Sequence, residues 1–284
     1  MASLNPSSPV SLPRYARVLS IAGSDSGGGA GIQADLKTMS ALGCFGMTAI
    51  TALTAQNTQG VRSIHGVPPA FLQEQLDAVL EDIGCDAVKI GMLHAPEIVA
   101  VVAAAIDHYA LPHVVLDPVM VATSGDRLIA EATVGELVRE LFPRAALITP
   151  NLDEAGLLLG RRLEHADQLE QAAQDLLALG AKAVLIKGGH LPGDEVVDLL
   201  ATADGERLRL ASTRIHTHNG HGTGCTLSSA IACQLALGQP LPQAVSLARQ
   251  YILGAIASGA DVHTGQGHGP LNHGWNPQKQ VIVR

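Results

Sequence analysis

Short apolar runs alternate with amphipathic helical segments along most of the chain, and this alternation constrains the fold more than any other feature. The runs have the length of buried strands, and the segments between them have the length of surface helices. A repeated strand–helix order predicts an α/β fold, with a mostly parallel central sheet flanked by helices on both faces. We expect strands at residues 17–22, 46–55, 86–90, 113–116, 145–149, 182–186, 195–200 and 207–212, and helices at 32–41, 69–83, 97–108, 130–141, 153–159, 165–179, 227–236 and 243–258.

The chain reads as one domain with a short tail. No stretch between the expected elements has the composition of a linker, and no internal repeat is visible, so we expect a single domain over residues 16–284. Residues 1–15 are expected to be a disordered tail, because the first thirteen are polar and contain proline without the apolar core of a signal peptide. No apolar run of about 18 residues predicts a membrane span.

Composition excludes several classes of partner. Acidic residues outnumber basic ones, and the formal net charge is −8, which disfavours a general nucleic-acid binder. Aromatic residues make up only 2% of the chain, too few for a base-stacking platform. The four cysteines, Cys44, Cys85, Cys225 and Cys233, form no C-x-x-C pair and no zinc-like spacing. We therefore expect free thiols and a reducing, cytoplasmic location.

Polar residues stand directly after several of the expected strands. Asp117, Asn151 and Lys187 each follow one of them. Because ligands of open α/β sheets bind at the carboxyl ends of the strands, these side chains predict a polar site at that edge.

A glycine-rich turn, HGTGC at residues 221–225, opens an expected helix of small residues. Its glycines let backbone N–H groups converge, and the helix N-terminus adds positive charge, which together favour phosphate oxygens. Cys225 stands at this positive end, where a thiolate is favoured. The simpler interpretation is a glycine turn with a small buried cysteine.

A second glycine-rich turn spans residues 23–31. It is not a Rossmann fingerprint, because Ile32 occupies the position of the last glycine, and it lacks the Gly-Lys-Ser/Thr of a Walker A loop. The turn therefore indicates a close approach of backbone to a ligand without naming a dinucleotide.

Taken together, these motifs resemble the ribokinase superfamily, and within it the bacterial hydroxymethylpyrimidine/phosphomethylpyrimidine kinases of thiamine biosynthesis. The resemblance runs from about Val18 to His273 in the family's order. It is carried by residues 22–38 (AGSDSGGGAGIQADLKT), 50–58 (ITALTAQNT), 89–93 (KIGML), 115–120 (VLDPVM), 148–155 (ITPNLDEA), 187–190 (KGGH) and 221–228 (HGTGCTLS).

The resemblance implies a ribokinase-like fold with a small lid, a homodimer and two ATP-dependent phosphorylations. The first is of 4-amino-5-hydroxymethyl-2-methylpyrimidine and the second of its monophosphate, with ATP and Mg²⁺ as cofactors. A pyridoxal or pyridoxine kinase of the same superfamily is the nearest alternative. Two other classes stay open: a Cys–His hydrolase using Cys225 and His221, and a non-catalytic pyrimidine-binding sensor.

The resemblance also implies roles for individual residues. Cys225 takes the place of the aspartate that acts as general base in sugar kinases of the superfamily. Near the nucleotide, Arg249 stands where a family lysine is expected. The implied catalytic residues are Gly222, Thr223, Gly224 and Cys225; the nucleotide-binding residues are Lys187, Thr223 and Asn151; the metal-binding residues are Asp117 and Glu154; and the substrate-binding residues are Gln56, Asp35, Gly23, Met92 and Val119.

Three of these residues have simpler interpretations as well. Lys187 could be a solvated loop lysine, and Glu154 could be a first-turn acid that complements a helix dipole. Gln56 could cap the turn that follows it. Against this, the Gln56 amide offers both a donor and an acceptor, which matches a ring nitrogen beside an exocyclic amine.

Overall fold

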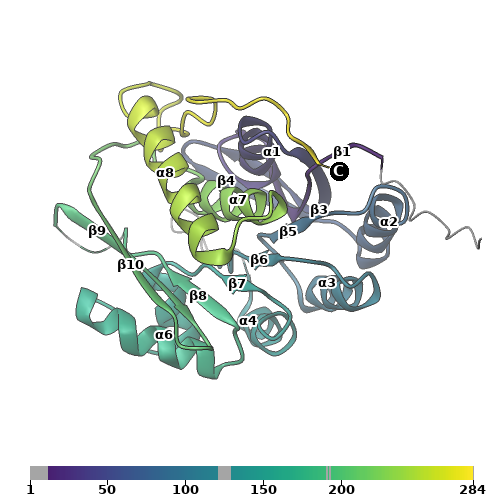
Figure 1. Ribbon diagram of the computed structural model, residues 1–284, viewed down its shortest axis with the longest axis horizontal. Coiled ribbons are helices and arrows are strands. Elements are labelled where there is room, and N and C mark those ends of the chain that lie inside the picture. The colour runs from purple at the N-terminus through teal and green to yellow at the C-terminus, as the bar shows by residue number, and fades with distance from the viewer. Residues whose placement is uncertain (1–11, 121–128, 190, 192, 284) are drawn as a thin grey trace, which may run out of the picture.

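The central feature of the computed structural model is one sheet that holds strands from both halves of the chain (Figure 1). The structure describes residues 12–120, 129–189, 191 and 193–283. Within these residues the sheet has nine strands in the order β10-β9-β8-β7-β6-β5-β2-β3-β4. Their bounds are β2 Arg17–Asp25, β3 Phe45–Asn57, β4 Gly60–Gly66, β5 Ala87–Ile90, β6 Val114–Leu116, β7 Leu147–Ile148, β8 Ala183–Ile186, β9 Glu195–Thr202 and β10 Arg207–Thr213.

The middle of the sheet is parallel and its edges are antiparallel. Strand β2 pairs in parallel with β3 on one side and with β5 on the other, and the parallel run continues through β6, β7 and β8. Strands β4, β9 and β10 pair antiparallel at the two edges. The prediction of a mostly parallel sheet is therefore confirmed. Strands β6 and β8 read as continuous apolar runs because both of their faces are buried, and β5 does so apart from Lys89.

Helices cover both faces of the sheet and bury two apolar cores. One face carries α1, α7 and α8, and the other carries α2 to α6. Their bounds are α1 Gly31–Ala41, α2 Pro69–Leu80, α3 Pro96–His108, α4 Glu131–Glu136 with the π-helical continuation η1 Leu137–Leu141, α5 Leu152–Leu159, η2 Ala166–Gln168 with α6 Leu169–Ala178, α7 Thr223–Ala236 and α8 Leu241–Gly259.

Helix α7 lies close to the sheet because its buried face is made of small side chains. Ser228, Ser229, Ala230, Ala232 and Cys233 are all buried, and the helix contacts β2, β5 and β6 as well as α1 and α8. This close approach brings the glycine-rich turn at its N-terminus to the carboxyl ends of the central strands.

The N-terminal part of the chain differs from its prediction. Arg14–Tyr15 form a short strand, β1, that pairs with β11 (Ile282–Val283) near the other end of the chain, so these two residues are ordered by main-chain pairing. Residues 1–11 of the predicted tail lie outside the described residues, and the single-domain organisation stays a prediction.

The hairpin of β3 and β4 was not predicted as such. Strand β3 runs through Gln56, the turn lies at Thr58–Gln59, and β4 follows directly. The strand expected at 46–55 ends before Gln56, and no strand was expected at 60–66, because β4 is largely exposed and lacks the apolar alternation that marks a buried strand. Among the described residues, no helix has both the length and the apolar character needed to cross a bilayer.

Candidate active site

Four predicted site residues meet at one edge of the sheet. Asp117 follows β6, Asn151 follows β7 and Lys187 follows β8, and these strands are parallel. Helix α7 begins against them, since a Cβ atom placed on Gly224 would lie 3.2 Å from Lys187 Nζ and 3.3 Å from Asp117 Oδ2. A cation, a carboxylate and a helix N-terminus therefore share one small space at the carboxyl ends of the strands.

Lys187 bridges two buried carboxylates. Its Nζ lies 2.8 Å from Asp117 Oδ1 and 3.8 Å from Glu154 Oε2, and Thr149 Oγ1 donates to Asp117 Oδ1 at 3.0 Å. Burial alone lowers the pKa of Lys187, but the carboxylates of Asp117 and Glu154 outweigh it and raise the pKa. Burial raises the pKa of Asp117, whereas Lys187 and Lys89 hold it below its ordinary value. Both groups of the Lys187–Asp117 pair are therefore charged at neutral pH.

Glu154 has two partners of different kinds. Its Oε2 accepts from the Asn151 backbone N–H at 2.8 Å, and Asn151 Oδ1 accepts from the Glu154 N–H at 2.8 Å, which forms a capping box at the start of α5. Burial raises the pKa of Glu154 to about 7, against the opposing charge of Lys187. The structural role as a first-turn acid is thus present, and the carboxylate still faces Lys187.

The raised pKa of Glu154 predicts a pH-dependent stability. The folded protein holds this proton up to about pH 7, whereas an unfolded glutamate loses it near 4.5. Stability of the ligand-free protein should therefore fall as the pH rises between these values. Glu154→Gln keeps the capping bond and removes the titration, so it should gain about 1–3 kcal/mol relative to the parent between pH 5 and pH 8. Thermal or urea unfolding at both pH values measures the difference.

The matched control is Glu131→Gln, which changes an exposed acid in the first turn of α4. This control should follow the parent at both pH values. If Glu154→Gln also followed the parent, the carboxyl group would titrate with its ordinary pKa in the folded protein.

The two glycine-rich turns pack against each other, backbone to backbone. Gly222 has a φ of 85°, and a Cβ atom there would lie 1.9 Å from the carbonyl oxygen of Gly29. Asp25 organises the first turn, since its carboxylate accepts from the N–H groups of Gly27, Gly29 and Ala30. The same carboxylate lies 2.9 Å from Nε2 of His221. One buried acid therefore holds both turns in register.

Cys225 lies at this junction, partly exposed. Burial raises the pKa of its thiol to about 11; the carboxylates of Asp35 and Asp117 add to the rise, and Lys89 and the Gly31 N–H oppose it. The expectation that the helix N-terminus favours a thiolate is therefore wrong for the ligand-free protein. Loss of water and two nearby carboxylates outweigh the helix terminus, a balance that sequence alone does not reveal.

Three other predicted substrate residues, Gly23, Gln56 and Met92, lie on or just after β2, β3 and β5, whereas Val119 follows β6. A Cβ atom on Gly23 would lie 2.7 Å from Met92 Cε, so Gly23 and Met92 are in contact. Gln56 is half-buried, and its amide lies 3.0 Å from Thr54 Oγ1 and 3.5 Å from His221 Nε2. Val119 is half-buried and donates its N–H to the Asp117 carbonyl at 2.8 Å. Gln56 thereby reaches the HGTGC turn through His221, and Val119 adjoins the charged end.

Comparison with known proteins decides the family. The sequence model of the phosphomethylpyrimidine kinase family matches residues 25–272. This chain belongs to that family.

Two relatives and one solved structure illustrate the similarity. The chain is 51% identical over 258 residues to the hydroxymethylpyrimidine/phosphomethylpyrimidine kinase of Rhizobium meliloti, covering 90% of this chain and 96% of that one. It is 52% identical over 257 residues to the thiamine biosynthesis bifunctional protein ThiED of Geobacter sulfurreducens, covering 90% of this chain but only 52% of that protein. An ADP complex of Bacillus subtilis pyridoxal kinase superposes with a TM-score of 0.84 at 37% identity, covering 92% of this chain and 98% of that one.

Asp35 was predicted to contact the substrate, but it lies inside the protein. Its side chain is fully buried, and its carboxylate accepts from Ser20, Lys89 and Ser229. Sequence reasoning gave no role to Lys89, although a lysine inside an apolar strand was a visible signal. In the ligand-free protein the Asp35 carboxylate is used within the fold and is not open to a ligand.

Arg249, which replaces an expected family lysine, acts inside the fold. It is buried on α8; its Nε donates to Asp198 Oδ2 at 2.8 Å, and its other nitrogens reach carbonyls of β9 and β10 and the Ser212 hydroxyl. Asp198 also accepts from the N–H of Gly188 at 2.9 Å. Arg249 thus supports the turn after Lys187 through Asp198. Its guanidinium charge is paired with the Asp198 carboxylate inside the protein.

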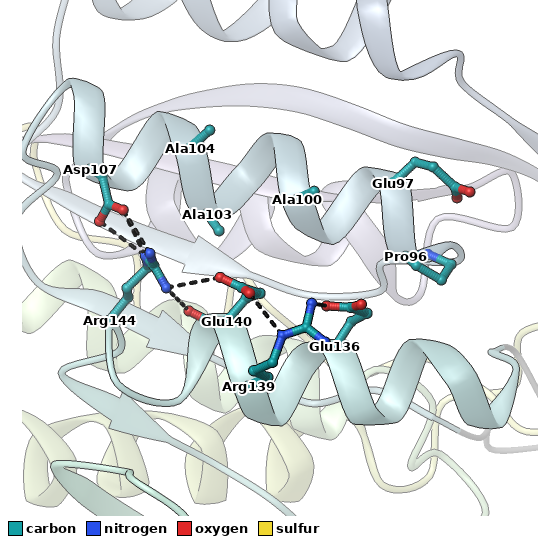
Figure 2. Close-up of a pocket in the computed structure, with 10 residues that line it drawn as sticks. All are labelled: Pro96, Glu97, Ala100, Ala103, Ala104, Asp107, Glu136, Arg139, Glu140 and Arg144. Carbon is teal, nitrogen blue, oxygen red and sulfur yellow. Dashed lines mark hydrogen bonds and ion pairs between the residues drawn. The ribbon is translucent and has the colours of Figure 1, made fainter.

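The groove drawn in Figure 2 is separate from these residues. It has a volume of about 520 Å³ between α3 and the α4–η1 helix, with Ala100, Ala103 and Ala104 on one wall. Arg139 pairs with Glu136 and Glu140, and Arg144 pairs with Asp107. Because its cations are paired with carboxylates of the same groove, it offers no free charge to a phosphate ligand.

The charged end of the site fits a nucleotide-bound magnesium ion better than a tightly caged metal. The described residues contain no group of three or more His, Cys, Asp or Glu side chains arranged to hold a metal ion. Asp117 and Glu154 provide two carboxylates within reach of one lysine amine. Magnesium keeps several waters and takes one or two carboxylates together with substrate phosphates, so this pair fits it.

Proposed function

We propose that this chain transfers the γ-phosphoryl group of ATP first to the hydroxymethyl group of 4-amino-5-hydroxymethyl-2-methylpyrimidine and then to the resulting monophosphate. The observation that carries the proposal is the meeting of Lys187, Asp117 and Glu154 with the N-terminus of α7, where Cys225 lies. Membership of the phosphomethylpyrimidine kinase family gives the same activity.

The transferring phosphoryl group would lie at the start of α7. The backbone N–H groups of Gly222, Thr223, Gly224 and Cys225 would bind its oxygens, and the closely packed glycine turns support them. The Thr223 N–H donates to the Gly220 carbonyl at 3.3 Å in the ligand-free protein, so it would exchange that partner for the phosphoryl oxygen. Lys187 would place its charge on the ATP phosphates, with Asn151 and Thr223 at the nucleotide. Asp117 and Glu154 would hold the magnesium ion, which supplies positive charge to the triphosphate.

Cys225 would accept the hydroxyl proton of the substrate. In the ligand-free protein this thiol, with a pKa of about 11, is protonated at neutral pH. The role therefore requires that binding of substrates lowers the pKa of the thiol. The hydrolase alternative fits less well, because the Nε2 atom of His221 is engaged with Asp25 and not with a nucleophile.

Pyridoxal kinase activity is the second candidate, favoured by the TM-score of 0.84 to Bacillus subtilis pyridoxal kinase. The two activities are separated by an assay of ADP release with phosphorylated product identified by mass spectrometry. The substrates are hydroxymethylpyrimidine, its monophosphate, pyridoxal and ribose. The proposal expects turnover of both pyrimidines with the highest kcat/KM; turnover of pyridoxal alone would overturn it.

Gln56 should set the preference for the pyrimidine. Gln56→Leu preserves bulk and removes the amide that we propose pairs with the ring nitrogen and amine. An unpaired polar edge in a buried site costs about 1–3 kcal/mol, so kcat/KM for the pyrimidine should fall roughly ten- to a hundredfold. The KM for ATP should change little, because Gln56 lies on β3 whereas Lys187 follows β8, and four other strands separate these two in the sheet.

Gln59→Leu is the matched control, since Gln59 is exposed in the turn of the same hairpin. It should keep the parent's kcat/KM. Equal handling of the pyrimidine by Gln56→Leu and Gln59→Leu would make Gln56 a residue of the hairpin alone, and the ring would be recognised elsewhere.

We also propose a homodimer and a cytoplasmic location. The β3–β4 hairpin carries exposed apolar side chains, Leu53 and Ile64, and Phe71 follows it on α2 with more than half of its surface exposed (54%). Leu53 pairs with His65 and Ile64 with Thr54, so the two apolar side chains lie on opposite faces of this edge hairpin. A second copy is the simplest partner for these exposed side chains, and light scattering coupled to size-exclusion chromatography tests it. All four cysteines are free thiols, as a reducing compartment requires.

A further inference from the structure

Lys89 is a fully buried cation in the middle of the sheet. It lies on β5, none of its surface is exposed, and its Nζ lies 2.9 Å from both carboxylate oxygens of Asp35 on α1. Asp35 is equally buried and also accepts from Ser20 Oγ at 2.6 Å and from Ser229 Oγ at 2.7 Å. The pair is therefore well satisfied, with further hydrogen bonds from β2 and α7.

Stability alone does not account for such a pair. Removing two charges from water costs about as much as their attraction returns, and apolar side chains of similar volume are often as stable or more so. A charge pair buried in the centre of the sheet therefore suggests that its charges act on a neighbouring group. That group is the thiol of Cys225.

The pair lies beneath Cys225. Ser229, which bonds Asp35, is four residues after Cys225 on α7, so both side chains are on the same face of that helix. Gly31, whose N–H is directed at the Cys225 thiol, is four residues before Asp35 on α1. Helix α7 thus carries the sulfur and a hydroxyl that bonds Asp35, and α1 carries Asp35 and an N–H directed at the sulfur.

We infer that Lys89 is a positioning residue for the phosphoryl-transfer site, which acts through Cys225: its ion pair with Asp35 ties the N-terminal halves of α1 and α7 together around the thiol and holds a buried cation beside it. This inference rests on the proposed function in one respect, which is that the thiol accepts the hydroxyl proton of the substrate. The ionisation of the thiol can be measured without any substrate.

Four charged groups face the thiol from the elements packed around it. Lys89 comes from β5, Asp35 from α1, Asp117 from the end of β6, and Lys187 from the end of β8. Among these groups Lys89 has the largest effect on the pKa of the thiol, which it lowers. The carboxylates of Asp35 and Asp117 have smaller effects, and both raise the pKa. Removing Lys89 and removing Asp35 should therefore have opposite effects on the thiol.

The experiment measures alkylation of Cys225 by iodoacetamide from pH 7 to pH 10 in the full-length protein. Mass spectrometry of the Cys225 peptide follows each reaction. Since the thiolate is the reacting form and a thiolate of lower pKa is a weaker nucleophile, one unit in the pKa of the thiol changes the rate about three- to fourfold in this range. Asp35→Asn should react faster than the parent, Lys89→Met should react slower, and each change should be at least several-fold.

A charge-free variant guards against misfolding. Lys89→Met combined with Asp35→Asn leaves no buried charge unpaired, and it should react slower than the parent because Lys89 has the larger effect of the two. The buried thiols of Cys44 and Cys233 report any opening of the fold, and both should stay unmodified. Cys85 lies elsewhere and should react as in the parent.

Two results would overturn the inference. One is an alkylation profile of Cys225 in the charge-free variant that coincides with the parent's. The other is faster alkylation of Cys225 in all three variants together with modification of Cys44 and Cys233, which would mark a structural role only. The proposed function is tested separately by turnover of the pyrimidine by the parent. Alkylation requires no substrate, so its outcome does not depend on that assay.

Discussion

Cys225→Ala should reduce kcat for the pyrimidine about 10²–10⁴-fold, because the variant loses the group that accepts the hydroxyl proton. The N–H groups at the start of α7 and Lys187 are retained, so ATP should bind with little change in Kd by isothermal titration calorimetry. The pH profile supplies a second readout. In the parent, kcat/KM should rise toward alkaline pH as the thiol ionises, and the alanine variant should lose that rise.

Cys85→Ala is the control for this experiment. Cys85 is likewise partly exposed, and burial likewise raises the pKa of its thiol to about 11, but it precedes β5 at the opposite end of that strand. The Cys85 variant should keep the parent's turnover and pH profile. Near-normal turnover by Cys225→Ala would show that the thiol only packs, which is the simpler interpretation of the HGTGC turn.

Much of the fold follows from local sequence patterns. Strands β6 and β8 are buried on both faces, so each appears as an apolar run, and each run ends at a polar residue that lies at the ligand-binding edge. The exposed strand β4 and the short pair β1–β11 were missed because main-chain pairing at an edge needs no apolar pattern. Such pairing depends on which segments meet in space.

The site could be predicted as a set of residues but not as a balance of charges. Lys187, Asp117 and Glu154 follow strand ends, and the structure brings them within one ion-pair network. The pKa of Cys225 depends instead on burial and on side chains from α1, β5 and β6, which are distant in sequence. A helix-terminus argument considers one element at a time, so it predicted a thiolate where the whole environment favours a thiol.

Asp35 illustrates the same limit from the other side. A carboxylate one turn into a helix after a glycine-rich turn suggests a ligand contact, and the sequence contains no sign that Ser20, Lys89 and Ser229 converge on it. These three residues come from three elements. Lys89 was the one available clue, because a lysine in a buried strand needs a buried partner.

Lys187→Gln should reduce kcat/KM for ATP about 10²–10³-fold, since it removes the cation that faces both the carboxylates and the helix N-terminus. It should also destabilise the ligand-free protein by about 3–5 kcal/mol, because Asp117 would be left as an unpaired buried charge. A loss of activity from this variant alone would therefore not separate chemistry from folding.

Combining Lys187→Gln with Asp117→Asn resolves this ambiguity. In the double variant Glu154 is the one acid of this network that remains, and loss of the Lys187 charge favours its neutral form, so most of the stability should return while turnover stays low. Asp117→Asn and Glu154→Gln by themselves should instead raise the magnesium concentration needed for half-maximal activity, with kcat partly recovered at high magnesium. Lys182→Gln, which changes an exposed lysine just before β8 at the other end of the strand, should resemble the parent throughout. If the double variant regained turnover together with stability, Lys187 would serve only to neutralise the two carboxylates, and the ATP phosphates would be bound by the N-terminus of α7 alone.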